Sequence, residues 1–357
     1  MKKIIAISFM LVLCLLTLTS CGKEKKADFD LQVASSYDIH TEIQKEYLAN
    51  DYKLISLYAN GQKELSRPQS IKITWDEMET LEYDFYLSET KNFSEKYHKT
   101  TTINEIDLIN LKINIDYYCY VECSVNDKIK KSDIETFSIK TNAPRNLKVN
   151  GVTNVRDLGG YEILPNKYTK QGLIYRSARF NENESTDLLI TEEGINIMLN
   201  TLKVKTELDV RKTANNENGG ITTSPLGETV NYYSIPMATG GNYLTLNKNV
   251  LKDVFAVFGN KDNYPIVIHC SIGTDRTGVI CFLINALLGV NEEDLYKDYL
   301  FSNFGYIEGS RSFSTIDKYL DTIKRCQGET LKDKTYNYLV SVGVNSSDLD
   351  FIIDIML

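Results

Sequence analysis

A ten-residue stretch, His-Cys-Ser-Ile-Gly-Thr-Asp-Arg-Thr-Gly at 269–278, constrains the fold of this chain more than any other. The residues before it, 264–268, are mostly apolar and β-branched, which predicts a short buried strand. The residues after it, 279–288, are apolar on nearly every face and stop at Gly289, which predicts a buried helix. The stretch is therefore a strand-to-helix turn. Unpaired N–H groups and the dipole at a helix start make such a turn a ready site for an anion such as phosphate.

The side chains in this turn predict a nucleophile and an anion clamp. Cys270 opens the turn and Arg276 follows six residues later, at the expected helix start. Thiols beside a helix N-terminus and an arginine lose their proton readily, which makes them nucleophiles. The planar fork of Arg276 matches two phosphate oxygens at once. Gly273 and Gly278 let the backbone curl, and the Thr277 hydroxyl can donate to the Cys270 sulfur.

These residues resemble the signature of the cysteine-dependent protein tyrosine phosphatases, His-Cys-x-x-Gly-x-x-Arg-(Ser/Thr)-Gly. The resemblance implies that Cys270 attacks phosphorus to form a cysteinyl-phosphate, without a metal or other cofactor. It also implies that backbone N–H groups and Arg276 meet the charge of the transition state. The residues expected to bind phosphate are Ser271, Ile272, Gly273, Thr274, Asp275 and Arg276.

Blocks elsewhere in the chain resemble the atypical bacterial tyrosine/serine phosphatase family. The match covers about residues 144–357 and opens with Asn-Val-Arg-Asp-Leu-Gly-Gly at 154–160. The remaining blocks are Gly-Leu-Ile-Tyr-Arg-Ser at 172–177, Glu-Leu-Asp-Val-Arg at 207–211 and Asp-Tyr-Leu-Phe-Ser-Asn at 298–303. Expected strands alternate with expected helices over this region. We therefore predict an α/β phosphatase domain with a mostly parallel central sheet flanked by helices.

Five residues outside the phosphate-binding set are expected to support the site. We interpret Asn154, Arg156 and Asp157 as a polar network that holds two loops together rather than as direct catalysts. Asp209 ends an expected strand, where ligands gather in α/β sheets, so it is a candidate to face the site. The resemblance gives His269 a supporting role.

Asp275 is the expected acid that protonates the leaving oxygen. Many relatives in the wider superfamily carry this acid in a Trp-Pro-Asp loop, but the only tryptophan here is Trp75. The atypical bacterial family has Asp at the position of Asp275. The alternative is that Asp275 caps the helix, with Asp209 as the reserve candidate for the acid.

The N-terminal residues predict export. Residues 1–20 have the layout of a secretory signal, two lysines followed by a short apolar run. Leu-Thr-Ser-Cys-Gly at 18–22 resembles the bacterial lipobox, so Cys21 is expected to carry lipid; a plain signal peptide is the alternative. We therefore expect an extracytoplasmic protein, lipid-anchored to the cell membrane. Residues 21–65 are expected to be a tether or spacer, or to add an edge element to the next domain.

Residues 66–143 show the period-two alternation of several short strands, which predicts an antiparallel β-sandwich. Two features resemble the fibronectin type III domain. Trp75 ends an early strand, and Leu111-x-x-x-x-x-Tyr117 has the spacing of that fold's tyrosine corner. Such a domain is either an adhesive or positioning module, or only a spacer between the membrane and the catalytic domain.

Charge and cysteine usage exclude some functions. The formal net charge is −8, and it becomes −10 without the two lysines of the leader, so broad binding of nucleic acid is not expected. Four cysteines, Cys119, Cys123, Cys281 and Cys326, fall in strand or helix patterns without disulfide or metal-ligand spacing. We interpret them as buried hydrophobic residues, and a bridge through Cys326 stays open.

The predicted function is a phosphomonoester hydrolase acting on phosphorylated proteins or small phosphoesters. A cysteine-dependent protein-tyrosine phosphatase is favoured, with dual specificity left open. An inositol-polyphosphate or phosphoinositide phosphatase is the first alternative. The related loops usually carry Lys where this chain has Thr274, and the missing point charge weakens that alternative. The second alternative is a non-catalytic phosphate-binding surface module.

Overall fold

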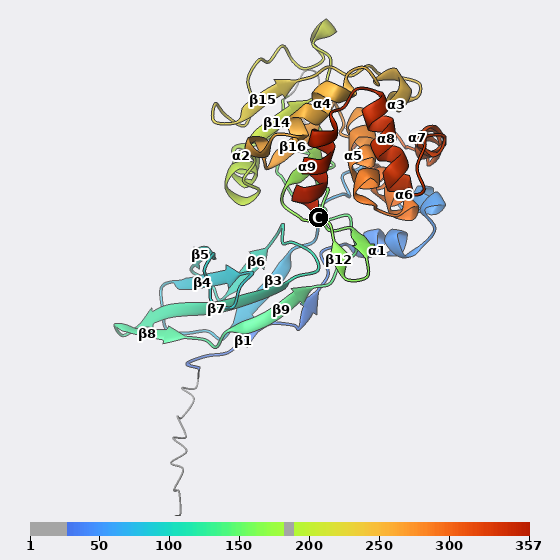
Figure 1. Ribbon diagram of the computed structural model, residues 1–357. Helices are drawn as coiled ribbons and strands as arrows, with labels where there is room; N and C mark the ends of the chain where they lie inside the picture. The colour runs from blue at the N-terminus through green and yellow to red at the C-terminus, as the bar shows by residue number, and fades with distance from the viewer. Residues whose placement is uncertain (1–26, 182–188) are drawn as a thin grey trace, which may run out of the picture.

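The computed structural model describes residues 27–181 and 189–357. They form a β-rich N-terminal region, at the bottom of Figure 1, and a C-terminal α/β region, at the top. The expected signal peptide and Cys21 lie outside the described residues. Within the described ranges, no helix is long and apolar enough to cross a membrane.

A five-stranded sheet in the order β10-β13-β16-β14-β15 forms the centre of the α/β region. Its strands are β10 (Arg156–Asp157), β13 (Ile174–Ser177), β14 (Thr206–Asp209), β15 (Asn231–Ser234) and β16 (Ile266–His269). Neighbouring strands from β13 to β15 are parallel, and only β10 is antiparallel, which confirms the mostly parallel sheet. The register places His269 between Ser177 and Asp209, so the ends of three strands meet at the site.

Helices cover both faces of this sheet. They are α2 (Glu192–Asn196), continued by the π-helical turn η3 (Ile197–Thr201), α3 (Tyr243–Leu246), α4 (Leu251–Phe258), α5 (Asp275–Leu288), α6 (Glu292–Phe301), α7 (Ser314–Lys324), α8 (Leu331–Ser341) and α9 (Ser346–Met356). Ile266 and Ile268 point into the core formed with α3 to α9, whereas Val267 points into the core on the α2 side. A strand that is buried on both faces explains why residues 266–268 are apolar without alternation.

Helix α5 is the expected buried helix, and its residues from Arg276 onward are all buried. It ends at Gly289, whose φ of 89° provides the left-handed C-cap. Helix α7 buries Ile316, Tyr319, Leu320 and Ile323, which recur at the three- and four-residue spacing of one helix face.

The β-rich region contains two sheets, in the orders β1-β3-β6 and β2-β9-β7-β4-β5, with β8 paired to β7. Their strands are β1 (Leu31–Gln32), β2 (Ser36–Tyr37), β3 (Ile71–Trp75), β4 (Tyr83–Ser88), β5 (Tyr97–Thr101), β6 (Glu105–Leu108), β7 (Asp116–Val125), β8 (Lys128–Lys131) and β9 (Glu135–Ile139). Trp75 of one sheet and Phe85 of the other share a single apolar core. The Tyr117 hydroxyl accepts a hydrogen bond from the backbone N–H of Lys112 (2.7 Å), the contact expected of a tyrosine corner.

The spacer expected over residues 21–65 is wrong for its described part. Strands β1 and β2 pair with β3 and β9, as the edge-element alternative predicts. Helix α1 (Glu42–Ala49) and the 3₁₀ helix η1 (Tyr52–Leu57) then bury Tyr47, Leu48 and Ile55 in the core of the α/β region. Buried Gln44 donates to the carbonyl oxygens of Leu65 (2.6 Å) and Arg67 (3.1 Å), so its polar side chain is satisfied far from its own helix.

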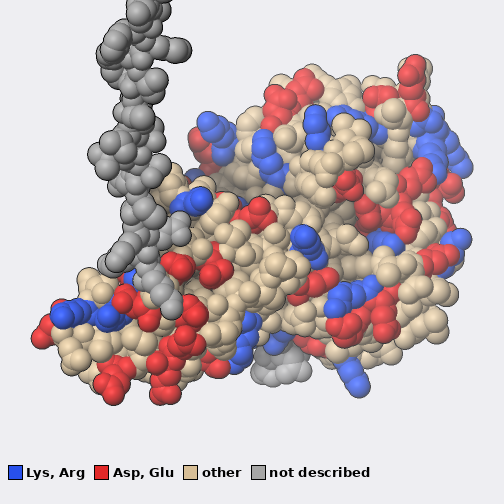
Figure 2. Space-filling model, turned by 90° about the horizontal axis from the view of Figure 1, so that it is seen from below, with Lys and Arg blue, Asp and Glu red and all other residues tan. Residues whose placement is uncertain are grey.

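The five described cysteines are all free thiols, including Cys326. Burial raises the pKa of both Cys119 and Cys281 to about 12, which agrees with their interpretation as inert hydrophobic residues. Positive and negative side chains are interspersed over the face of the molecule shown in Figure 2, without a single broad basic field on that face.

Candidate active site

The predicted strand–turn–helix is present at residues 266–288. Strand β16 ends at His269, Cys270 follows with 2% of its surface exposed, and helix α5 begins at Asp275. Gly273 has a φ of 67°, and a Cβ atom there would overlap the carbonyl oxygen of Ser177. Only glycine therefore fits where the catalytic loop, residues 270–276, passes the end of β13.

Arg276 is held by a carboxylate from another loop. Its two terminal nitrogens donate to Glu217 (3.0 and 2.5 Å), and the backbone N–H of Lys212 also donates to Glu217 (3.0 Å). Burial alone would raise the pKa of Glu217, but these hydrogen bonds hold it below its ordinary value. Burial also opposes the charge of Arg276, while the hydrogen bonds and charge of Glu217 help to raise the pKa of Arg276 above its ordinary value. The guanidinium is thus charged and fixed in direction.

Asp275 is anchored by residues from beyond the catalytic helix. Arg311 donates from Nε to Oδ1 (3.0 Å) and from one terminal nitrogen to Oδ2 (3.0 Å), and the Tyr299 hydroxyl donates to Oδ1 (2.9 Å). The Asp275 side chain is 16% exposed, so it remains in contact with solvent. The structure does not show Asp275 accepting a hydrogen bond as a helix cap; its described partners are side chains.

Asn154, Arg156 and Asp157 form the polar network expected of them. The Asn154 amide donates to the carbonyl oxygens of Ile272 (3.1 Å) and Gly273 (3.2 Å), and its oxygen accepts from Arg156. Asp157 accepts from the backbone N–H groups of Gly159 (2.8 Å) and Gly172 (2.7 Å) and from Arg145 (2.6 Å). The first two residues therefore support the catalytic loop, whereas Asp157 fixes the chain beside it.

Asp298 of α6 connects the same network to β13. It binds Arg176 (2.5 Å) and Arg156 (3.4 Å), and Arg176 donates in turn to the Gly273 carbonyl oxygen (2.9 Å). Burial alone would raise the pKa of Asp298, but the charges of Arg176 and Arg156 hold it below its ordinary value of 3.8. Two arginines and one carboxylate thus fix the backbone of the catalytic loop through its carbonyl oxygens.

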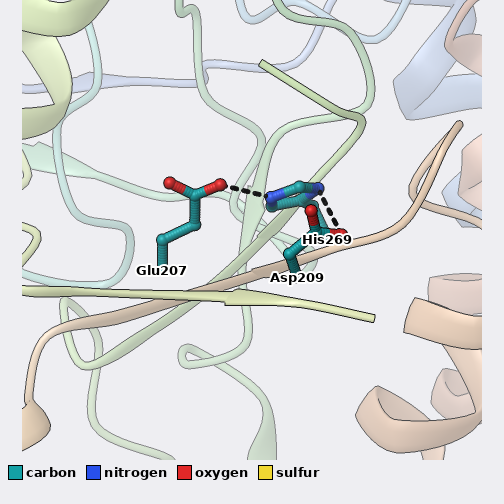
Figure 3. A group of neighbouring side chains, drawn as sticks. All are labelled: Glu207, Asp209 and His269. Carbon is teal, nitrogen blue, oxygen red and sulfur yellow. Dashed lines mark hydrogen bonds and ion pairs between the residues drawn. The ribbon is translucent and has the colours of Figure 1, made fainter. Parts of the chain in front are cut away.

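His269 lies between two carboxylates of β14 (Figure 3). Its Nε2 is 2.8 Å from Oε1 of Glu207, and its Nδ1 is 3.9 Å from Oδ1 of Asp209. The three side chains are buried and close enough together to hold a metal ion. However, Asp209 already forms a two-nitrogen ion pair with Arg211, and Glu207 accepts from Ser224 (2.5 Å). Because Arg211 supplies the countercharge that a cation would supply, these residues fit an internal ion-pair network better than a metal site.

Asp209 is therefore poorly placed as a proton donor. Burial would raise its pKa, but His269 and Arg211 hold the pKa of Asp209 below its ordinary value. The Tyr232 hydroxyl donates to the same carboxylate (3.0 Å), and the side chain is fully buried. Asp275 also pairs with an arginine and a tyrosine hydroxyl, but its side chain is 16% exposed whereas that of Asp209 is fully buried. Access to the leaving group, rather than the ion pair, therefore favours Asp275 over Asp209 as the acid.

Two threonines of the site differ in their partners. Thr274 is buried and faces Asn154, whose amide lies 3.3 Å from its hydroxyl. The Thr277 hydroxyl is buried and has no hydrogen-bond partner in the described part of the chain. It remains available to a group on the catalytic loop.

Sequence reasoning missed four residues that contact the site. Glu217 binds Arg276, and Arg311 binds Asp275. Glu207 binds His269, and Arg179 donates to the Ser271 carbonyl oxygen (3.2 Å). Glu207 lies inside the block at 207–211 that carries the family resemblance, which was a usable signal, whereas Arg179 lies outside every such block. Glu217 and Arg311 lie in polar loops whose composition carries no signal.

Comparison with known proteins agrees with this geometry. Residues 147–342 match the sequence profile of a tyrosine phosphatase family. No curated protein matches the chain. Among solved structures, the chain is similar to the core catalytic domain of the PP-IP phosphatase SIW14 from S. cerevisiae in complex with citrate. The identity is 22% over 44% of this chain and 88% of that chain, with a TM-score of 0.31.

Two further solved structures have weaker similarity. A second structure of the Siw14 catalytic core is 18% identical over 46% of this chain and 88% of that chain, with a TM-score of 0.30. A fibronectin type III domain derived from human KIAA0970 protein is 16% identical over 40% of this chain and 93% of that chain, with a TM-score of 0.19. The family match spans more than half of the chain and includes the whole catalytic loop, so this protein belongs to the tyrosine phosphatase family.

Proposed function

We propose that this protein is a phosphomonoester hydrolase that uses Cys270 as its nucleophile. The observation that carries the proposal is the catalytic loop itself, in which Cys270 and a fixed, charged Arg276 lie at one helix start. A binding module that only captures phosphate would need the arginine and the N–H groups but not a thiol at the entrance. The second alternative, a non-catalytic phosphate-binding module, is therefore less well supported.

The proposed reaction has two steps. The Cys270 thiolate attacks phosphorus, an S–P bond forms, and the ester P–O bond breaks while Asp275 gives a proton to the leaving oxygen. Water then attacks phosphorus, the S–P bond breaks, and Asp275 takes a proton from the water. Arg276 and the loop N–H groups hold the equatorial oxygens throughout. The Thr277 hydroxyl, which has no partner in the described residues, is proposed to stabilise the sulfur as it leaves.

Phosphotyrosine in proteins is the proposed substrate, with dual specificity open. An inositol-polyphosphate or phosphoinositide substrate remains the alternative, and SIW14 from S. cerevisiae is a PP-IP phosphatase. Multiply phosphorylated substrates favour added positive charge on the loop. Position 274 offers only the hydroxyl of a threonine that is buried against Asn154. That observation supports the monophosphate assignment.

Turnover of p-nitrophenyl phosphate tests the proposed function. The full chain should release p-nitrophenol and inorganic phosphate in equal amounts without added metal. A panel of phosphotyrosine peptides, phosphoserine peptides and inositol polyphosphates should then rank phosphotyrosine first. Binding of phosphate without turnover of any substrate would refute the proposal.

We also propose that the mature protein is anchored outside the cytoplasm by lipid on Cys21. The support is the sequence at 18–22, which lies outside the described residues. Mass spectrometry of membrane fractions should find a lipid-modified N-terminal cysteine. An unmodified N-terminus in the medium would contradict the anchor without affecting the proposed reaction.

A further inference from the structure

A pocket of about 330 Å³ lies away from Cys270, where the N-terminal segment crosses the α/β region. Its lining residues are Gln62, Lys63, Glu64, Arg67, Val152, Thr153 and Tyr306. Backbone hydrogen bonds fix the crossing segment, from Gly61 to Asn303 (2.8 Å) and from Leu65 to Phe304 (2.6 Å). The pocket therefore has a defined wall on both sides, and one wall comes from the part of the chain that was expected to be a spacer.

The charges of this pocket suit an anion. Lys63 and Arg67 are exposed, and in the described residues neither side chain forms an ion pair or hydrogen bond. The lining carboxylate, Glu64, is already occupied, because it accepts from the backbone N–H (2.9 Å) and hydroxyl (2.6 Å) of Ser66 and from the Thr153 hydroxyl. Two cations without such partners therefore line one pocket, where they can act on the same anion.

The back wall of the pocket is also the support of the catalytic loop. Thr153 lines the pocket, and the next residue, Asn154, donates to the carbonyl oxygens of Ile272 and Gly273. The backbone N–H of Asn154 donates to the Ser66 hydroxyl on the pocket side (3.3 Å). A ligand in the pocket would thus be separated from the catalytic loop by little more than one residue.

We infer that this pocket is a second binding site for substrate, which takes the carboxylate of an acidic residue near the phosphotyrosine of a protein. The inference rests on the proposed function and names its substrate class. An extended peptide covers about 3.3 Å per residue, so residues that flank the phosphotyrosine of a protein substrate extend well beyond the catalytic loop. The phosphates of an inositol polyphosphate are confined to one small ring and do not extend along the surface in this way, which makes it the less suitable ligand.

A double substitution tests this inference in the full chain. Wild-type protein should show a kcat/KM about tenfold higher for a phosphotyrosine peptide flanked by Glu residues than for the same peptide with Gln. Lys63→Ala/Arg67→Ala should reduce that ratio to about one, mainly by raising KM for the acidic peptide. The control Lys99→Ala/Lys128→Ala removes two exposed lysines of the β-rich region and should keep the wild-type ratio.

Two results would overturn the inference. One is equal kcat/KM of the wild type for both peptides; the other is an equal loss on both peptides in the double variant. Loss of inositol hexakisphosphate binding alone, without loss of the peptide preference, would also contradict it. If the wild type hydrolyses neither peptide, that result refutes the proposed function but does not test the pocket. Binding of the two phosphopeptides to Cys270→Ser, with and without Lys63→Ala/Arg67→Ala, then still decides by calorimetry whether Lys63 and Arg67 bind the acidic residues.

Discussion

The two regions of this molecule bury different kinds of side chain. The core of the β-rich region is apolar, and its ion pairs, such as Lys72–Glu105, lie on the surface. The α/β region buries charged groups, among them Arg156, Arg176 and Asp298, next to its catalytic loop. Burying an ion pair costs desolvation energy that its attraction barely recovers, whereas burying apolar surface is favourable. We therefore infer that the buried charges position the catalytic loop, whereas burial of apolar side chains stabilises the β-rich region.

Removal of Asp298 should show the largest effect on stability. Asp298→Ala leaves Arg156 and Arg176 buried without their countercharge, which should cost about 3–5 kcal/mol of unfolding free energy. Denaturant titration measures the loss. Asp107→Ala, on the exposed face of β6, is the matched control and should leave the free energy nearly unchanged. A small, equal effect of both substitutions would remove the contrast between the two regions.

The same carboxylate predicts the pH dependence of stability. The pKa of Asp298 is below 3.8 in the folded protein and ordinary in the unfolded chain. Its contribution is therefore complete above 3.8 and is lost as the pH falls through the lowered value. Between about pH 4 and pH 2 the wild type should lose stability more steeply than Asp298→Ala, if the variant folds. Parallel curves would contradict the ion-pair assignment.

Substitution of Arg276 tests whether the fork, rather than the charge, matters. Arg276→Lys keeps the charge but loses the planar contact with both Glu217 and the phosphate, and kcat should fall by about 10²–10³. Circular dichroism and denaturant titration should show that folding is retained. A variant that keeps wild-type kcat would show that the two-nitrogen contact with Glu217 has no role in turnover.

Asp275→Asn tests the proposed acid. Asparagine can accept from Arg311 through its one oxygen only, because its amide nitrogen is a donor, and it cannot release a proton. We expect a loss of about 10²-fold on phenyl phosphates with poor leaving groups and much less on activated esters, with a changed basic limb of the pH–rate profile. Equal losses on all esters, with an unchanged profile, would leave Asp275 as an anchor for Arg311 and not as the acid.

The smallest effect is expected in the β-rich region. Tyr117→Phe removes the hydrogen bond from Lys112 and should reduce the unfolding free energy by about 1 kcal/mol. Activity on p-nitrophenyl phosphate should not change, because Tyr117 is remote from Cys270 in the fold. Tyr118→Phe, whose side chain is only half-buried on the same strand, is the control. Loss of activity in Tyr117→Phe would show that the two regions are coupled.

The sequence predicted the catalytic loop because its signals are local. The apolar residues at 266–268 and the glycine at 273 lie within four positions of Cys270, and Gly289 marks the end of the next helix. The blocks containing Asn154 and Arg156 were also correctly interpreted as a network, because polar residues at strand ends must find partners.

The contacts that join distant segments could not be predicted in this way. Glu217 is 59 residues from Arg276, and Arg311 is 36 residues from Asp275, so no periodicity connects them. The packing of helix α1 on the α/β region could not be predicted for the same reason. Its apolar face is short, and only the surface of α6 and its neighbours makes burial of Tyr47 and Leu48 favourable.

Covalent trapping of the phosphoenzyme tests the central claim most directly. With p-nitrophenyl phosphate, the wild type should release a burst of p-nitrophenol that approaches one equivalent if breakdown of the intermediate is slow. Rapid quenching and mass spectrometry should then find phosphate on Cys270. Cys270→Ser should fold, bind phosphate analogues, give no trapped phosphocysteine and retain less than about one thousandth of the wild-type kcat. Phosphate trapped on another residue, or a Cys270→Ser variant with substantial turnover, would contradict the mechanism.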